Sequence, residues 1–371
     1  MQRFRHLDWV LILAVVPLLI FGLFTMKSLG GSDYYFWRQL EWIGVGFVVL
    51  IVATLTDWRL FKSSIVILSL YAVAVALLGG LVVLGHTTRG VQSWFYIGSA
   101  GVEPVEVAKL ALMLLLAKYF SGRDVEIALA RHIIVSILYL ILPLGLVFVQ
   151  PDIGSAAILL FLWMCMVLFA GMNMKQIAFF GALGVCGVLV GWFLLLQPYQ
   201  KARVASFLQP ERDPRGSGYH AIQAMIAVGS GGVWGKGVGY GTQSRLNFLP
   251  ESETDFVFAA FAEEWGLVGV TMIFISFGVI FWRIIKIALG APENFPRLVA
   301  MGVGFLLLGH IIIHVGMNVG LLPITGIGLP FMSYGGSFLV LLMALLGILE
   351  SIAIRSSIRG YEDTGSLVLS P

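Results

Sequence analysis

The sequence predicts an all-α, polytopic integral membrane protein with about ten transmembrane helices and a large extracytoplasmic loop between the seventh and the eighth. Of the 371 residues, 59% are hydrophobic and only 12% are charged, which is typical of a membrane protein. Apolar runs close to the roughly 20 residues that cross a bilayer recur along the chain. The one-sided placement of lysine and arginine orients these runs. We therefore treat residues 1–371 as a single transmembrane domain.

The candidate transmembrane helices are the long apolar runs, in chain order. They cover residues 8–26, 40–56, 65–85, 105–120, 133–149, 154–171, 176–196, 256–281, 298–320 and 331–353. The first run is not expected to be a cleaved signal peptide, because it is too long, lacks a small-residue cleavage site and precedes further runs. The large loop is 197–254, and a short tail, 354–371, follows the last run.

Basic residues collect on one side of these runs. The segments on that side hold Arg3, Arg5, Arg59, Lys62, Lys118, Arg123, Arg131, Lys175, Arg283, Lys286, Arg297, Arg355 and Arg359. The short loops on the other side hold Lys27, Arg38 and Arg89. Because such residues mark the cytoplasmic side, both termini are predicted to be cytoplasmic and the loop 197–254 to face outward. The formal charge of +3 follows from this bias, so nucleic-acid binding is not expected.

Cysteine and histidine usage gives little support for a metal or redox site. Cys165 and Cys186 lie within apolar runs and match neither a disulfide framework nor metal-ligand spacing. His310 and His314 are four residues apart in the ninth run, which leaves a zinc site open. Without an acidic partner nearby, packing or a hydrogen bond in a polar lumen is the favoured interpretation. No organic cofactor is expected.

Charged residues stand where the fourth and sixth runs begin. The aromatic residues at 94–96 suit an interfacial belt, and Pro104 suits the first turn of a helix. Glu106 and Lys109, three residues apart, then share one helical face. They form either an ion pair that lets the helix insert or the charged lining of a polar cavity, and both interpretations stay open. Asp152 is expected to cap the next helix and to help shape an outer cavity.

The outer loop 197–254 is too long for a simple connector. Apolar residues at helical spacing in 219–228 predict a short amphipathic helix on the membrane surface. The glycine-rich segment 229–241 lacks the residue order of a phosphate-binding loop. It is expected to allow tight turns and a close approach of the backbone to a bound molecule. Arg203 and its basic neighbours are predicted to bind an anionic, phosphate-bearing ligand at the outer leaflet.

Carboxylates gather where this loop enters the eighth run. Glu251 precedes Asp255, for which capping of the helix is a sufficient interpretation. A helix N-terminus also stabilises its carboxylate, which makes it a weaker base but a ready ligand of Mg²⁺ or Mn²⁺. About two turns further, Glu263 and Glu264 lie in hydrocarbon and need a partner. Lys109 is the most obvious candidate.

The segment 320–337 interrupts the helical pattern with Pro323, Pro330 and several glycines. Irregular backbone at membrane depth is tolerated only against protein or a wet cavity. We therefore expect this segment to wall the same outer cavity, with Ser333 and Ser337 able to bond a ligand.

The residues alone leave the function open between two classes. An outward polar cavity with one buried cation and several carboxylates fits an enzyme that acts on a lipid-linked phosphate substrate. It fits a proton-coupled transporter or a lipid flippase equally well, because such proteins also bury carboxylates and break helices near the midplane.

An ordered series of motifs across nearly the whole chain resembles the SEDS family (shape, elongation, division and sporulation). The motifs are Glu103-Pro-Val-Glu106-Val-Ala-Lys109, Gln150-Pro-Asp152-Ile-Gly, Gly218-Tyr-His-Ala-Ile-Gln-Ala, Gly241-Thr-Gln-Ser-Arg-Leu-Asn-Phe-Leu-Pro-Glu251, Thr254-Asp255-Phe, Ala262-Glu-Glu-Trp-Gly and Leu329-Pro-Phe-Met-Ser-Tyr-Gly-Gly-Ser337. The Gly-Thr-Gln-Ser run points to the branch of the family that acts in cell elongation. The chain departs from the family pattern at Glu103, where glutamine is usual, and at Glu253, where histidine is common.

The resemblance implies peptidoglycan glycosyl transfer at the outer face of the bacterial cytoplasmic membrane. Lipid II, a disaccharide-pentapeptide on undecaprenyl pyrophosphate, would be both donor and acceptor. Asp255 would be the essential carboxylate, Lys109 and Arg203 would contact pyrophosphate, and Glu106 would orient Lys109. A class B penicillin-binding protein and membrane proteins of the elongation complex are the expected partners. A lipid II flippase and a non-enzymatic scaffold for the transpeptidase remain as alternatives.

Overall fold

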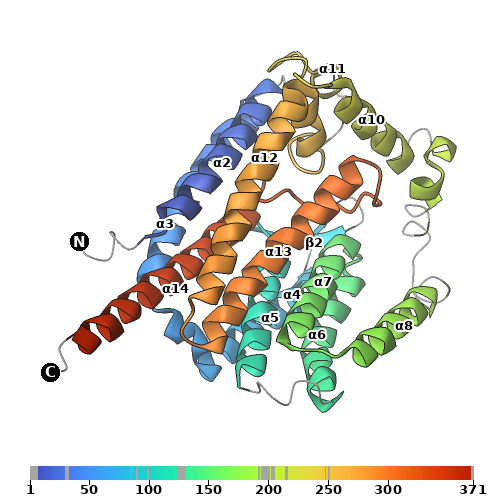
Figure 1. The fold of residues 1–371 in the computed structure, drawn as a ribbon. Coiled ribbons are helices and arrows are strands. Elements are labelled where there is room, and N and C mark those ends of the chain that lie inside the picture. Colours follow the sequence, from blue (N-terminus) through green and yellow to red (C-terminus); the bar gives the residue numbers. More distant parts are fainter. Residues whose placement is uncertain are drawn as a thin grey trace.

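The computed structural model describes residues 7–29, 33–84, 86–88, 91–97, 100–122, 130–190, 193, 201, 205–213, 216–246, 248–249 and 251–368. Within these residues the protein is a bundle of long α-helices with three short strands (Figure 1). The all-α fold class is therefore confirmed, and the strands are a small addition that the sequence did not indicate.

The elements follow the chain in two groups, separated by the start of the outer loop. The first group comprises α2 (Trp9–Ser28), α3 (Tyr34–Leu55), the 3₁₀ helix η1 (Trp58–Lys62), α4 (Ser64–Leu84), β1 (His86–Thr88), β2 (Val91–Ile97), β3 (Ala100–Val102), α5 (Pro104–Ser121), α6 (Ala130–Val149), α7 (Ile153–Ala170) and α8 (Met174–Val190). The second comprises η3 (Pro210–Arg212), α10 (Ser217–Ser230), α11 (Thr242–Arg245), α12 (Val257–Leu289), α13 (Asn294–Asn318) and α14 (Gly336–Val368). The strands pair antiparallel in the order β1-β2-β3.

A helix lies at the place of every predicted span. Eight of the described helices are long and apolar enough to cross a membrane. The other two positions are taken by α5, which carries Glu106, Lys109 and Lys118, and by the 17 described residues of α8. A count of ten spans therefore stays a prediction. The last helix differs from expectation, because α14 starts at Gly336 and continues to Val368, through most of the predicted tail.

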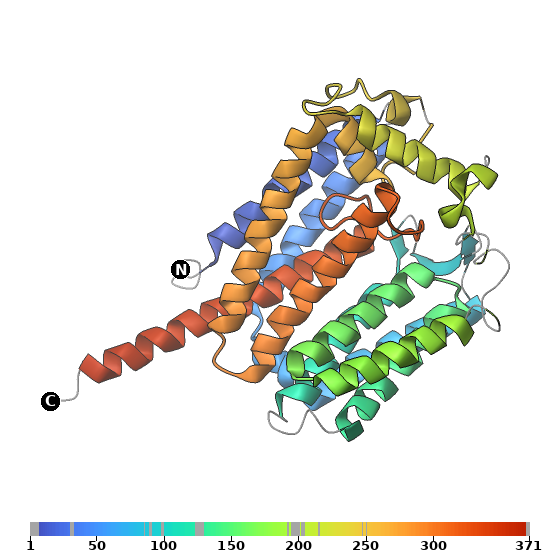
Figure 2. The ribbon, with the colours of Figure 1, turned by 45° about the vertical axis from the view of Figure 1, so that its right-hand side comes forward.

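Helices distant in sequence pack side by side in the bundle. The most extensive packing is between α3 and α14, between α2 and α12, and between α4 and α5, while α13 packs against α5, α7 and α12. In Figure 1, α8 lies at the right-hand edge of the molecule, and in Figure 2 the C-terminal part of α14 projects away from the bundle. Most residues of α5 are buried, and so are most residues in the apolar stretches of α13 and α14 that are long enough to cross a membrane. The core therefore lies around α5, α13 and α14, and residues near one end of each of these helices frame the site described below.

The helix α12 is broken at Gly266, whose φ of 63° and ψ of −162° are not helical. Residues 232–237 of the outer loop lie against this break and complete its backbone hydrogen bonding. The bonds run from Lys236 N to Glu263 O (2.9 Å), Gly237 N to Glu264 O (3.0 Å), Leu267 N to Gly232 O (2.9 Å) and Val268 N to Val233 O (3.1 Å). Since unpaired backbone groups are costly when buried, this contact fixes the loop to the helix.

Glycine is required where the two backbones meet. A Cβ atom on Gly231 would lie 2.0 Å from the carbonyl oxygen of Ala262, and one on Gly235 would lie 2.1 Å from that of Glu264. The sequence predicted a close approach of this glycine-rich segment to a bound molecule. For these two glycines the close approach is confirmed, but the prediction of a bound molecule is wrong, because the backbone that they approach is that of α12.

Replacing Gly231 by alanine is expected to lower the free energy of unfolding in detergent by roughly 1–3 kcal/mol, because the added methyl group must displace helix backbone. Gly229 is the matched control, since it lies in α10 two residues earlier and has no atom within 4 Å of an added Cβ. Thermal unfolding of both purified variants measures the difference. Equal unfolding temperatures for Gly231→Ala and Gly229→Ala would contradict the importance of the contact.

Candidate functional site

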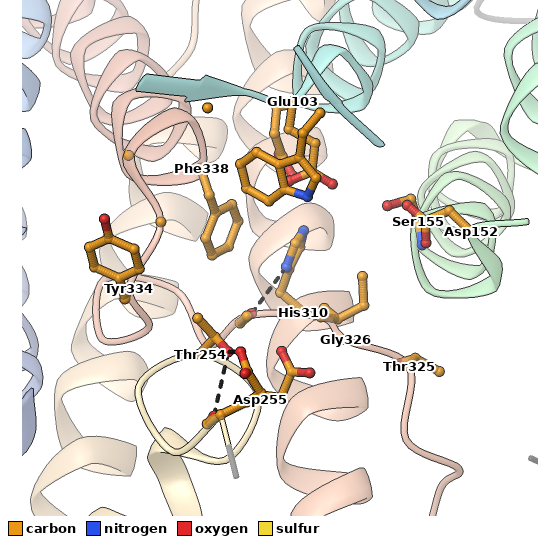
Figure 3. Close-up of a pocket in the computed structure, with 18 of the residues that line it drawn as sticks. Glu103, Asp152, Ser155, Thr254, Asp255, His310, Thr325, Gly326, Tyr334 and Phe338 are labelled. Carbon is orange, nitrogen blue, oxygen red and sulfur yellow. Dashed lines mark hydrogen bonds between the residues drawn. The ribbon is translucent and has the colours of Figure 1, made fainter. Parts of the chain in front are cut away.

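A cavity of about 550 Å³ opens at one end of the helix bundle. The starts of α3, α5, α7 and α14, the turn before α12 and the irregular segment 324–328 form its wall. The polar and aromatic lining residues include Tyr34, Tyr35, Trp42, Trp94, Glu103, Glu106, Lys109, Asp152, Ser155, Glu251, Thr254, Asp255, His310, Thr325, Tyr334 and Phe338. Figure 3 shows Glu103, Asp255 and His310 around this space. The prediction that part of 320–337 walls the cavity is thus confirmed.

Glu106 and Lys109 form a buried ion pair on one face of α5. The Lys109 Nζ atom lies 2.8 Å from Glu106 Oε1, and the two side chains are 1% and 6% exposed. The second carboxylate oxygen of Glu106 is buried and has no hydrogen-bond partner among the described residues. Both residues also line the cavity. The two interpretations of this pair are therefore compatible, since one pair provides both self-neutralisation and a charged lining.

Two histidines of α13 hold the irregular wall in place. The Nδ1 atom of His314 lies 2.7 Å from the carbonyl oxygen of Ile327, and that of His310 lies 3.3 Å from the carbonyl oxygen of Gly328. These contacts favour the hydrogen-bonding interpretation of the pair over a zinc site. In the part of the chain that the structure describes, no group of three His, Cys, Asp or Glu side chains is placed to hold a metal ion.

Asp255 lies in a turn before α12 and lines the cavity. The cap position of α12 is Phe256, so the interpretation of Asp255 as the cap of this helix is wrong. The turn is fixed by the carbonyl oxygen of Glu251, which accepts hydrogen bonds from the amides of residues 254–256 at 3.0–3.2 Å. Glu251 itself has a φ of 54°, a conformation that few non-glycine residues adopt.

Asn318, which the sequence analysis did not single out, attaches this turn to α13. Its fully buried side chain donates through Nδ2 to the carbonyl oxygen of Asp255 (3.0 Å) and accepts through Oδ1 from the amide of Ala259 (3.1 Å). An amide at the end of an apolar run was the available signal, because a buried amide needs partners.

Asp152 caps α7, as predicted. Its carboxylate accepts a hydrogen bond from the amide of Ser155 at 3.0 Å, and both residues line the cavity. Trp94 of β2 also lines the cavity. It belongs to the site, whereas the sequence placed it in an interfacial belt.

Ser333 and Ser337 do not face the cavity as expected. The Ser333 hydroxyl is buried, donates to the carbonyl oxygen of Thr254 (2.8 Å) and accepts from the amide of Leu329 (2.7 Å). It therefore joins the irregular wall to the turn that carries Asp255. The Ser337 hydroxyl is also buried, and Ser337 is not among the residues that line the cavity. Neither hydroxyl is placed to bond a ligand directly.

Glu263 and Glu264 bind the outer loop, so the prediction that they pair with Lys109 is wrong. Glu263 Oε1 lies 2.7 Å from Lys236 Nζ, and the carboxylate accepts from the amides of residues 242–244 at 2.8–3.3 Å. Glu264 accepts from the Gly239 amide (3.0 Å) and the Ser28 hydroxyl (2.7 Å). The break in α12 and the loop packed over it bring these partners to the two carboxylates. Arg203 lies outside the described residues.

Glu103 places another carboxyl group in the cavity wall, immediately before α5. Burial raises the pKa of this carboxyl well above its usual range, and the negative charge of Glu106 raises it further. Glu103 is thus more readily protonated than an exposed glutamate. Its proton would make it a hydrogen-bond donor among the other acidic groups of the cavity.

Comparison with known sequences gives matches over most of the chain. A profile of the FtsW/RodA/SpoVE family, described as cell cycle protein, matches residues 4–358. The chain is 35% identical to the peptidoglycan glycosyltransferase MrdB of Escherichia coli (strain K12), over 94% of this chain and 93% of that protein. It is 30% identical to the peptidoglycan glycosyltransferase RodA of Treponema pallidum, over 94% and 98% of the two chains.

Comparison with solved structures gives the same fold. A structure that describes how a peptidoglycan synthase complex coordinates polymerization and crosslinking matches with a TM-score of 0.80 and 28% identity, over 94% of this chain and 98% of that chain. The crystal structure of the rod shape determining protein RodA of Thermus thermophilus matches with a TM-score of 0.69 and 28% identity, over 94% and 96% of the two chains.

Replacing Glu106 alone by leucine is expected to destabilise the protein by roughly 3–5 kcal/mol, because the ammonium group of Lys109 is then buried without its counter-charge. The double variant Glu106→Leu/Lys109→Leu should recover most of this loss. Thermal unfolding in detergent compares the two. A double variant no more stable than the single one would contradict the assignment of the pair as mutually neutralising.

Replacing Glu103 by glutamine is expected to make the protein more stable than the wild type as the pH rises. A carboxyl whose pKa is raised by folding stabilises the fold most below the ordinary glutamate pKa of about 4.3, and this contribution is lost as the pH rises through the folded value. The amide cannot ionise. Unfolding temperatures of both proteins, from acidic to alkaline buffers, should diverge in favour of the variant, and parallel curves would refute the shift.

Proposed function

The chain belongs to the FtsW/RodA/SpoVE family of cell cycle proteins, and we propose that its cavity is where lipid II is polymerised into glycan strands. The protein is a membrane-embedded peptidoglycan glycosyltransferase of the kind that acts in cell elongation and shape. The proposal concerns the substrate, the residues that act on it and the side of the membrane on which they act.

The observation that carries the proposal is that Asp255 and Lys109 line the same cavity. Lys109 comes from α5 and Asp255 from the turn before α12, and each is fixed by contacts that the rest of the site provides. Lys109 supplies positive charge at a buried position, and Asp255 supplies a carboxylate at the cavity surface. A diphosphate leaving group and a sugar hydroxyl need this combination of a positive and a basic group.

In the proposed step, the 4-hydroxyl oxygen of an acceptor N-acetylglucosamine attacks C1 of the donor N-acetylmuramic acid. The new C–O glycosidic bond forms while the bond from C1 to the diphosphate oxygen breaks. Asp255 accepts the proton that leaves the hydroxyl, and Lys109, oriented by Glu106, stabilises the negative charge on the departing diphosphate. Arg203 is proposed as a second contact of the diphosphate.

A divalent cation, Mg²⁺ or Mn²⁺, fits this cavity only as an ion shared with the substrate. Asp255 offers one carboxylate, and the described residues offer no cluster of three protein ligands. Magnesium is commonly held by one or two carboxylates together with substrate phosphate oxygens. Such an ion would supply further positive charge at the diphosphate, and Asp255 would then serve as its ligand.

The partner protein and the orientation of the chain in the membrane follow from the same proposal. The solved structure that this chain resembles describes a peptidoglycan synthase complex that couples polymerization to crosslinking. We infer that a class B penicillin-binding protein binds this chain, within an elongation complex of membrane proteins. We place the chain in the bacterial cytoplasmic membrane, with the cavity facing outward and both termini facing the cytoplasm.

Replacing Asp255 by alanine is expected to abolish the formation of glycan strands, because the group that accepts the proton or binds the cation is removed. Purified protein with its transpeptidase partner, supplied with lipid II and a divalent cation, is assayed for strands on a gel. Binding of the partner should stay unchanged. Asp33→Ala is the matched control, because Asp33 is an exposed carboxylate, paired with Lys27, that does not line the cavity.

Other outcomes of this assay identify other functions. Wild-type activity in Asp255→Ala would remove Asp255 from the mechanism. Movement of lipid II across the membrane of vesicles, without formation of glycan strands, would support a flippase. Binding of the transpeptidase with neither strands nor lipid movement would support a scaffold.

A further inference from the structure

His310 lies between the buried cation of the site and the irregular wall of the cavity. Its Nε2 atom is 3.4 Å from Nζ of Lys109, and its Nδ1 atom is 3.3 Å from the carbonyl oxygen of Gly328. Its ring stacks on Phe338, with centroids 4.7 Å apart and planes inclined by 23°. The imidazole is therefore fixed at both nitrogens and on one face.

One neutral form of the imidazole satisfies both polar contacts. The ammonium group of Lys109 only donates hydrogen bonds, so Nε2 has to accept. The carbonyl oxygen of Gly328 only accepts, so Nδ1 has to carry the proton. A doubly protonated ring would place an N–H group against the ammonium group, and the two positive charges would repel each other.

The contacts of Lys109 account for two of its three N–H groups. Among the described residues, Glu106 Oε1 accepts at 2.8 Å and His310 Nε2 accepts at 3.4 Å. Because Lys109 also lines the cavity, the third N–H group is left for a molecule bound there. A neutral acceptor restricts the direction of this group without cancelling the charge of the ammonium, which a second carboxylate would do.

We propose that His310 is a positioning residue, which aims the free N–H group of Lys109 at the diphosphate of the lipid-linked substrate. This inference rests on the function proposed above. His310 acts through Lys109 and also anchors it to the cavity wall at Gly328. The ammonium group and the wall then keep a fixed distance from each other.

The chain contains a natural control for a purely structural role. His314 lies one turn along α13 and contacts the same wall through the same atom, Nδ1, at 2.7 Å from the carbonyl oxygen of Ile327. Its Nε2 atom is buried without a hydrogen-bond partner among the described residues. Both histidines thus support the wall, but of the two only His310 contacts Lys109.

Two amide replacements separate the two contacts of His310. The terminal amide of asparagine stands as many bonds from the backbone as Nδ1, so His310→Asn keeps the donor to Gly328 and loses the acceptor for Lys109. The amide of glutamine stands as far as Nε2, so His310→Gln keeps the acceptor for Lys109 and loses the donor to the wall. His314→Asn keeps the corresponding wall contact and serves as the control.

The assay measures kcat and KM for lipid II with the intact complex, together with the unfolding temperature of each variant. His310→Asn is expected to lower kcat by roughly 10–100-fold with little change in KM, because the misdirected group acts on charge that develops during the reaction. His310→Gln should recover most of the rate, and His314→Asn should resemble the wild type. Binding of undecaprenyl diphosphate, measured without turnover, should weaken in His310→Asn more than in His310→Gln.

Three results would overturn the proposal: a wild-type rate and wild-type binding in His310→Asn, an equal loss in both His310 variants, or losses that follow the unfolding temperature. Failure of the proposed function is distinct from these, since it appears as an absence of strands with the wild-type complex. The binding measurement then still tests whether His310 positions Lys109.

Discussion

The half of this protein that holds the cavity depends on the contact between the loop segment 232–237 and the break in α12. Four backbone hydrogen bonds replace those that the helix loses at Gly266. The carboxylates of Glu263 and Glu264 extend the contact to the loop backbone as far as residue 244. The part of α12 before the break is thereby held against the outer loop, and the turn with Asp255 leads directly into it.

The polar chemistry of the cavity depends on groups that are each tied to more than one element. Asn318 joins Asp255 to α13, Ser333 joins the same turn to the irregular wall, and His310 joins that wall to Lys109 on α5. Because interiors of this kind deform little, the carboxylate and the ammonium group are held in a fixed arrangement. This rigidity suits stabilisation of charge that develops during a reaction, for which pre-organised groups are the effective ones.

Features that depend on local spacing were predictable from the sequence. The pairing of Glu106 with Lys109, the cap at Asp152 and the helix α10 each involve residues within a few positions of one another. Features that depend on tertiary placement were not. Most partners of Glu263 and Glu264 lie in a loop 19–27 residues earlier, Ser28 lies on α2, and the glycine that breaks α12 sits inside a predicted transmembrane run. The sequence of the short strands shows no clear alternation of polar and apolar residues. Trp94 was therefore predicted to lie in an interfacial belt and not in the cavity wall.

The convergence of helix starts on the cavity has an electrostatic consequence. The first residues of α3, α5, α7 and α14, and the turn before α12, all contribute to its wall. The peptide units of a helix add up to a macrodipole whose positive end, about half an elementary charge, is at the N-terminus. Several such ends oriented toward one space offset the surplus of acidic side chains. The potential inside the cavity is therefore less negative than its formal charges suggest, which lowers the electrostatic cost of bringing any anionic group into it.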